Sequence, residues 1–280
     1  MKIGIELGKE YRRYGDAVYK MLKRHGYSYV DFSLLDTDDI LYTMSESDMK
    51  QKLLNEKNLA HEEGIEIWQT HGPWRCPVKD ATAEDRRERM EKMKKSLYMT
   101  SLLDCRNWVI HPIMPFGLSD KNTPDAEKTW ELNLEFMSEI LKTAKEYSIT
   151  VCLENMPFEN FSISTPAEIL KVVKEINDEN FKICFDTGHA ICLGESPAEA
   201  VRMLGSEIKA LHVHDSRVGN DLHLMPYFGI CDWKDFANAL RETGFSGAFS
   251  LETNPPALPD ELFEKMSVML AEVADSIIKK

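Results

Sequence analysis

The hydrophobic pattern of the chain repeats one unit eight times. In each unit, a short run rich in β-branched or aromatic residues, typical of a strand, precedes a longer segment with apolar residues at helical spacing. The strand-like runs span residues 2–7, 27–34, 65–71, 107–113, 150–156, 181–187, 208–214 and 247–253. Strict alternation of strands and helices predicts a parallel sheet.

The helix signals agree with this division. Apolar residues recur every three or four positions in the segments 130–144 and 263–277, which predicts helices with one buried face. Residues 165–168 and 196–199 have the form Thr/Ser-Pro-Ala-Glu, a capping box with proline at the first helical position, so we expect a helix to begin at each. Three glycines should end helices just before a strand: Gly26, Gly64 and Gly244.

Eight such units predict a single (β/α)₈ TIM barrel that spans residues 1–280 as one domain. Closure into a barrel is the economical arrangement at this number of strands. An open, doubly wound sheet would also satisfy the alternation alone. The chain shows no linker, low-complexity tract or break in composition.

Charge argues against a nucleic-acid partner. The sequence has 34 Lys and Arg against 47 Asp and Glu, a formal net charge of −13, so its overall field repels phosphate backbones. The longest basic cluster, residues 86–95, is interleaved with Glu88 and Glu91, and we interpret it as a solvated helix face.

The cysteines and the hydropathy favour the cytoplasm. The six cysteines include no Cys-x-x-Cys pair, and Cys152 and Cys184 lie in apolar strand-like runs, as buried residues of a reducing compartment do. No apolar segment has the length of a signal peptide or a membrane span, so we expect no membrane partner.

Polar side chains gather where the predicted strands end, which in a βα barrel is where active sites lie. Six of the eight histidines and several carboxylates fall there or in the following loops: His71, His111, Glu154, Asp186, His189, His212, His214, Asp215, Asp221, His223 and Glu252. The other two histidines, His25 and His61, lie on predicted helices, and we expect them at the surface.

Two of these carboxylates predict a bound cation. Glu154 and Glu252 follow the apolar runs Val-Cys-Leu and Phe-Ser-Leu, where an ionised carboxylate is costly unless positive charge compensates it. Two carboxylates facing each other at one mouth would repel unless a cation lay between them. Carboxylates together with imidazoles suit Mn, Zn, Co or Mg.

Five motifs at the strand ends carry a resemblance to a known superfamily. They are Cys-Leu-Glu154-Asn-Met-Pro, Phe-Asp186-Thr-Gly-His189, His212-Val-His-Asp-Ser, Asp221-Leu-His223-Leu-Met-Pro and Ser-Leu-Glu252-Thr. Over essentially its whole length the chain resembles the xylose isomerase-like TIM barrels. These include sugar and sugar-phosphate isomerases and epimerases of the D-tagatose 3-epimerase type, and an apurinic (AP) endonuclease with three zinc ions.

The resemblance implies a set of metal ligands. As in the isomerases, one divalent ion would be bound by Glu154, Asp186, His212 and Glu252. The loop after the seventh strand departs from the family pattern, because the usual Pro-Gly-Glu-Gly turn is here Pro-Tyr-Phe-Gly at residues 226–229. The shape of that loop is therefore not predicted.

The endonuclease branch implies two further metal sites. One would use His71 and His111 with the shared Glu154, and the other would use His189, Asp221 and His223. Sugar-handling members can keep these histidines as substrate-binding groups. The expected number of ions is therefore one, with up to three allowed.

The first hypothesis is isomerisation or epimerisation of a keto-sugar or its phosphate. The ion would bind the carbonyl and the adjacent hydroxyl oxygen and stabilise a cis-enediolate. Glu154 and Glu252 would lie on opposite faces of that plane, one removing a proton from carbon and the other returning it. His189 and Arg217 could hold hydroxyls or a phosphate, although Arg217 could equally be a surface residue. Aromatic residues could wall the pocket or be ordinary packing: Trp74, Phe116, Phe158 and Tyr227.

Three alternatives stay open. The same enolate chemistry would serve a dehydratase or a C-glycoside lyase. Phosphodiester cleavage at abasic DNA by a trinuclear zinc site fits the ligand set, but Arg75, Lys79 and Arg217 are the only evident basic residues in the strand-end loops. A non-catalytic barrel would usually have lost a ligand, and this chain has lost none. Similar barrels often pair, which leaves a homo-oligomer open.

Overall fold

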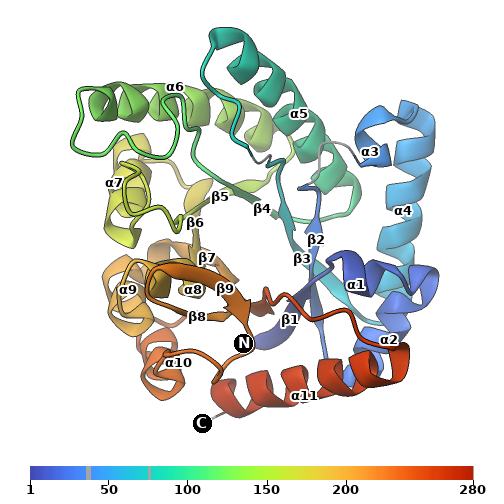
Figure 1. The fold of residues 1–280 in the computed structure, drawn as a ribbon. Coiled ribbons are helices and arrows are strands. Elements are labelled where there is room, and N and C mark those ends of the chain that lie inside the picture. The colour runs from blue at the N-terminus through green and yellow to red at the C-terminus, as the bar shows by residue number, and fades with distance from the viewer. Residues whose placement is uncertain (36–38, 75–76, 280) are drawn as a thin grey trace.

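The computed structural model describes residues 1–35, 39–74 and 77–279 and shows a ring of helices around a central set of strands (Figure 1). Arg75 and Cys76 lie outside the described residues. Eight strands form one parallel sheet in the order β10-β1-β2-β3-β4-β5-β6-β7. They are β1 (Lys2–Glu6), β2 (Tyr29–Ser33), β3 (Glu66–His71), β4 (Asn107–Ile110), β5 (Thr150–Glu154), β6 (Phe181–Asp186), β7 (Ile208–His212) and β10 (Ala248–Leu251). Each lies inside its predicted run.

The sheet closes between its first and last members. Just past β7, the Val213 amide donates to the Ser250 carbonyl over 2.8 Å, and the Glu252 amide donates to the Val213 carbonyl over 3.0 Å. Val213 also forms a parallel bridge with Leu251. The (β/α)₈ barrel is confirmed, and the open doubly wound sheet is not what the chain forms.

Eleven α-helices and two 3₁₀ turns are found in the described residues. The helices are α1 (Lys9–Arg12), α2 (Val18–His25), α3 (Ile40–Thr43), α4 (Glu46–Glu62), α5 (Ala83–Leu102), α6 (Asp125–Glu146), α7 (Pro166–Ile176), α8 (Thr187–Cys192), α9 (Pro197–Leu204), α10 (Trp233–Glu242) and α11 (Asp260–Ile278). The 3₁₀ turns are Gly15–Ala17 and Gly205–Glu207. None of the helices within the described ranges is long and apolar enough to cross a membrane.

The predicted helix ends are observed. Thr165 caps α7 with a complete capping box, whereas at α9 only half of the predicted box is found, with the Ser196 hydroxyl accepting from the Glu199 amide. Gly26, Gly64 and Gly244 have φ of +99°, +66° and +73°, a region open to glycine because it has no Cβ.

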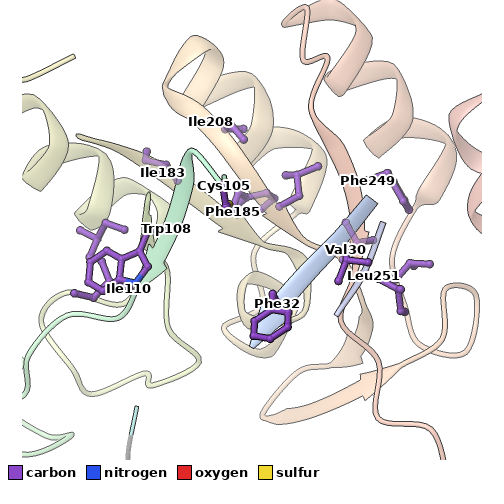
Figure 2. Packing of buried hydrophobic residues seen from close by; sticks show 14 of the residues in the cluster. Val30, Phe32, Cys105, Trp108, Ile110, Ile183, Phe185, Ile208, Phe249 and Leu251 are labelled. Carbon is purple, nitrogen blue, oxygen red and sulfur yellow. The ribbon is translucent and has the colours of Figure 1, made fainter. Parts of the chain in front are cut away.

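Alternate residues of each strand face opposite sides of the barrel wall. One set packs against the helices, and Figure 2 shows part of it, including Trp108 and Ile110 on β4 and Ile183 and Phe185 on β6. The intervening residues form a separate small cluster inside the barrel: Val109, Cys152, Cys184 and Ala210. Cys152 and Cys184 are fully buried, as expected. Two residues further along each of these strands, the same inward direction reaches the barrel mouth.

Three expectations about exposure and local structure are wrong. His25 is buried, because its Nδ1 lies 3.0 Å from the Ser267 hydroxyl of α11. Arg89, within the basic cluster of α5, is also buried, because it forms an ion pair with Asp80. The segment after β7 was expected to be a loop, but it forms a β-hairpin in which β8 (Asp215–Arg217) pairs antiparallel with β9 (Asn220–Leu224).

Candidate metal centre

Four side chains meet at the barrel mouth, and we call them the quartet: Glu154, Asp186, His212 and Glu252. Each offers one ligand atom within 4.8 Å of the others. Glu154, Asp186 and His212 are the last residues of β5, β6 and β7, and Glu252 follows β10. Their strands adjoin, so the residues predicted to bind one ion are brought together.

Glu154 is the centre of the hydrogen-bonded network. Its Oε1 lies 2.6 Å from Nδ1 of His212, and its Oε2 lies 2.8 Å from Nε2 of His111 and 3.3 Å from Nε2 of His71. Burial raises the pKa of Glu154, but His212 and His111 outweigh it and hold the pKa well below its usual range. Burial lowers the pKa of His111 to about 4, even though Glu154 opposes that shift.

His212 is held from behind by a carboxylate on β2. Its Nε2 lies 2.9 Å from Oδ2 of Asp31, and the same oxygen accepts from Nε2 of Gln69 over 2.8 Å. Asp31, Gln69 and His212 are all buried. If an ion were bound, a hydrogen bond from Nε2 of the neutral imidazole to Asp31 would leave the Nδ1 lone pair of His212 facing the other three members of the quartet, the arrangement in which carboxylates orient metal-binding histidines.

Glu252 is a carboxylate with a buried oxygen that has no hydrogen-bond donor among the described residues. This oxygen, Oε2, lies 3.1 Å from Nδ1 of His212. That nitrogen already faces Glu154 at 2.6 Å. Burial, with the carboxylates of Glu6 and Glu154, raises the pKa of Glu252 well above its usual range despite the attraction of His212. Three carboxylates and one imidazole converging on one point fit a divalent cation of the Mn, Zn, Co or Mg group.

A second cluster lies beside the quartet: His189, His214, Asp221 and His223. Oδ2 of Asp221 lies 3.5 Å from Nε2 of His189 and 3.3 Å from Nε2 of His223. Burial lowers the pKa of both histidines, but the carboxylates prevail: Asp186 and Asp221 raise that of His189 to about 10, and Asp221 raises that of His223 to about 9. The second set of predicted residues is thus also brought together.

His214 connects the two clusters. Its Nε2 lies 3.1 Å from Oδ2 of Asp186, and its ring stacks on His223 with centroids 4.0 Å apart. Burial raises the pKa of Asp186, but His189 and His214 outweigh it and bring the pKa to about 2. A Cβ on Gly188 would lie 1.8 Å from the His214 ring, so the ring can occupy this position only because residue 188 is glycine.

The residues predicted to bind substrate are placed less uniformly. Trp74 is half-buried and meets the edge of His111, with ring centroids 4.7 Å apart. Phe158 is half-buried, whereas Phe116 and Tyr227 are exposed. Arg217 is exposed in the hairpin opposite Asn220, and among the described residues it forms no hydrogen bond or ion pair with either cluster.

Three residues of the mouth were missed by the sequence reading: Glu6, Asp31 and Gln69. The signal used for Glu154, a carboxylate within an apolar strand, is also present in Lys-Ile-Gly-Ile-Glu6 and Tyr-Val-Asp31-Phe. His214 was noted at a strand end but was given no place in a cluster.

Comparisons with known proteins agree with this fold. The family model of the xylose isomerase-like TIM barrel matches residues 19–271. An uncharacterised protein of Methanocaldococcus jannaschii is 32% identical over 63% of this chain and 62% of its own length. A D-psicose 3-epimerase of Ruminiclostridium cellulolyticum is 28% identical over 70% of this chain and 66% of its own. Both matches therefore span less than two thirds of the relatives.

A solved structure shares the fold over nearly the whole length. The IOLI protein, described with a bound zinc atom, superposes with a TM-score of 0.76 and 16% identity, covering 99% of this chain and 98% of its own. Fold and mouth define a βα barrel with a carboxylate-histidine centre. The chain belongs to the xylose isomerase-like TIM barrel family.

Proposed function

We propose that the chain is a divalent-metal-dependent isomerase or epimerase of a keto-sugar or its phosphate. The convergence of Glu154 and Glu252 on Nδ1 of His212 carries the proposal. The D-psicose 3-epimerase among its relatives supports the sugar substrate, and the zinc of the IOLI protein supports the metal. The quartet would hold one ion, which is the expected number.

The two glutamates would handle the proton. When bound, the cation supplies positive charge that polarises the carbonyl and stabilises the enediolate. Burial and the repulsion of nearby carboxylates raise the pKa of Glu252, which favours its protonated form, whereas the pKa of Glu154 is held low, which favours its ionised form. The ionised glutamate would take the proton from the carbon next to the carbonyl, and the other, protonated from solvent, would deliver its proton to the opposite face. Asp186 and His212 complete the ligand set, and Asp31 fixes the orientation of the His212 ring.

The proposal predicts solvent proton exchange at carbon. Metal-loaded protein incubated with ketohexoses in deuterium oxide should introduce deuterium next to the carbonyl and form a second ketose, followed by NMR spectroscopy. Glu154→Gln and Glu252→Gln should each reduce turnover by about 10²–10⁴-fold while the barrel stays folded. Near-normal turnover in either variant would remove that glutamate from the proton transfer. Elimination of water or of an aglycone would instead indicate a dehydratase or a C-glycoside lyase.

A second candidate, hydrolysis of abasic DNA, is favoured by one observation. The described residues include three groups of candidate ligands, and within each group the ligand atoms lie within 4.8 Å of one another. More than one ion could therefore bind. The net charge of −13 opposes DNA binding. His71→Ala should reduce turnover only mildly in an isomerase with one ion and severely in a trinuclear phosphodiesterase. Cleavage of an abasic duplex by zinc-loaded protein, lost in His71→Ala, would favour this candidate.

A further inference from the structure

Glu6 is a carboxylate of the barrel mouth that the proposed reaction does not use. It is the last residue of β1, which lies between β10 and β2 in the sheet. In register, Glu6 pairs with Asp31, and Ile5 pairs with Leu251, the residue before Glu252. Glu6 therefore stands between two inward carboxylates at the same level of the barrel.

The position of β1 places Glu6 across the mouth from much of the quartet. In the closed sheet, β1 is four strands from β5 in either direction, so Glu6 faces the strand that carries Glu154. A ketose held at the quartet by two adjacent oxygens has further hydroxyls on its carbon chain. Those that extend across the mouth would meet the part of the barrel wall formed by β1 and β2.

Glu6 lacks the partner that a half-buried carboxylate normally has. Among the described residues, none donates a hydrogen bond to it or forms an ion pair with it, whereas the carboxylates of the quartet, of the second cluster and of β2 each contact a histidine: Asp31, Glu154, Asp186, Asp221 and Glu252. Burial and the nearby Asp31 raise the pKa of Glu6. A polar group left without a protein partner in such a position is costly unless a ligand or water satisfies it.

No lysine or arginine in the described residues pairs with Glu6 or with the carboxylates beside it, although His212 contacts both Asp31 and Glu252. A phosphate or carboxylate brought against Glu6 would face the like charge of Glu6, with the buried Asp31 nearby, and this repulsion would oppose its binding. A hydroxyl meets no such penalty, because it can donate a hydrogen bond to the Glu6 carboxyl group.

We propose that Glu6 binds a hydroxyl group of the substrate and excludes an anionic group from the end of the sugar that reaches β1. This inference rests on the proposed function, which supplies the polyhydroxylated ketone. It makes Glu6 a specificity-determining residue, and it requires the substrate to be unphosphorylated at that end.

Two substitutions separate the hydrogen bond from the charge. Glu6→Gln removes the charge and keeps an acceptor, whereas Glu6→Met keeps the approximate size and removes both. Binding of a ketohexose and of its 1-phosphate and 6-phosphate to metal-loaded protein is measured by calorimetry, alongside KM and kcat. Glu66→Gln is the matched control, since Glu66 is an exposed glutamate at the other end of a barrel strand.

The expected results differ between the variants. Glu6→Met should raise the Kd and KM of the free ketose about 10- to 100-fold, as loss of a hydrogen bond to a charged group does, with kcat nearly unchanged. Wild-type protein should bind at least one of the two phosphates with a higher Kd than the free sugar. Glu6→Gln should reduce the ratio of these two Kd values about tenfold. Glu66→Gln should match wild type. Metal content and melting temperature should be unchanged in all variants.

The outcomes separate this inference from the function on which it rests. Unchanged ketose binding in Glu6→Met, or wild-type preference for both phosphates over the free sugar, would overturn the role of Glu6 while leaving an epimerase intact. Ketose binding that weakens in Glu6→Met without any turnover would sustain Glu6 and contradict the epimerase. If no ketose binds to metal-loaded wild-type protein, both fail.

Discussion

At the scale of the residue, the contact between Asp31 and His212 decides the geometry of the quartet. Oδ2 of Asp31 accepts a hydrogen bond from Nε2 of Gln69 and lies 2.9 Å from Nε2 of His212. Its other carboxylate oxygen, although buried, has no hydrogen-bond partner among the described residues. The pair fixes which imidazole nitrogen faces Glu154 and Glu252. An orienting carboxylate of this kind commonly affects metal affinity although it never touches the ion.

Asp31→Asn tests that role. The amide keeps the shape of the side chain but loses the charge that holds the Nε2 proton of His212, so the Kd for Mn²⁺ or Zn²⁺ should rise about 10- to 100-fold. Calorimetric titration of metal-stripped protein measures it. Asp16→Asn, which removes an exposed carboxylate near α2, is the control and should bind as wild type does. An unchanged Kd in Asp31→Asn would show that His212 is positioned by other contacts.

Some residues of the site could be predicted from the sequence, and the contacts of others could not. Glu154 and Glu252 could be predicted because each is a carboxylate after an apolar strand, and Asp31 and Glu6 carry the same signal. What the sequence could not show is that Asp31 meets His212, because that contact joins residues 181 positions apart. The side-chain direction of Arg217 was equally invisible, since its exposure depends on a hairpin that the sequence reading took for a loop.

At the scale of the element, the junction of β6 and α8 sets the spacing between the two clusters. Asp186 ends β6 and caps α8 by accepting from the His189 amide over 2.6 Å, so one residue serves the strand, the helix and the quartet. Gly188 follows in the first turn, where the His214 ring leaves no space for a side chain. Packing therefore holds His214 against Asp186.

Gly188→Ala should disturb this junction severely. The new Cβ would lie 1.8 Å from the ring, so either His214 or α8 must move, and we expect a loss of at least about 1–3 kcal/mol in the free energy of unfolding. Gly8→Ala is the control, because its Cβ would approach nothing closer than 3.8 Å. Urea unfolding of both variants is the measurement. Equal stabilities would mean that the overlap relaxes without cost.

The packing of α2 on α11 makes a pH-dependent contribution. His25 of α2 contacts Ser267 of α11, and burial lowers its pKa from 6.5, with Arg24 adding to that effect and Glu264 opposing it. Because the folded pKa is below the unfolded one, the unfolded chain binds more protons as the pH falls. The contribution of His25 is therefore complete above about pH 6.5 and declines below it until the folded pKa is reached.

His25→Gln isolates that contribution, since glutamine can keep a hydrogen bond to Ser267 without titrating. Melting temperatures measured between about pH 7 and pH 5 should fall less steeply for the variant than for wild type. The comparison cancels any contribution of the histidines of the mouth, because they are the same in both proteins. Parallel curves would show that His25 is not protonated differently in the folded and unfolded chains.

At the scale of the whole molecule, the fold was predictable because it is repetitive. Eight alternations of period-two and period-3.6 patterns lie within residues 1–280, and each observed strand falls inside its predicted run. Closure depends on contacts between β7 and β10, which no local pattern encodes. The carboxyl ends of the eight parallel barrel strands lie at one mouth, so histidines and carboxylates between residue 6 and residue 252 meet there.

The central claim is that the quartet binds a divalent metal ion, and metal titration tests it most directly. Chelator-treated protein is titrated with Mn²⁺, Zn²⁺, Co²⁺ and Mg²⁺ by calorimetry, with elemental analysis of the dialysed product. We predict at least one tightly bound ion per chain, lost when Asp186 and Glu252 are both replaced by alanine in a protein that stays folded. Absence of binding by all four ions, or full binding by the double variant, would contradict the account.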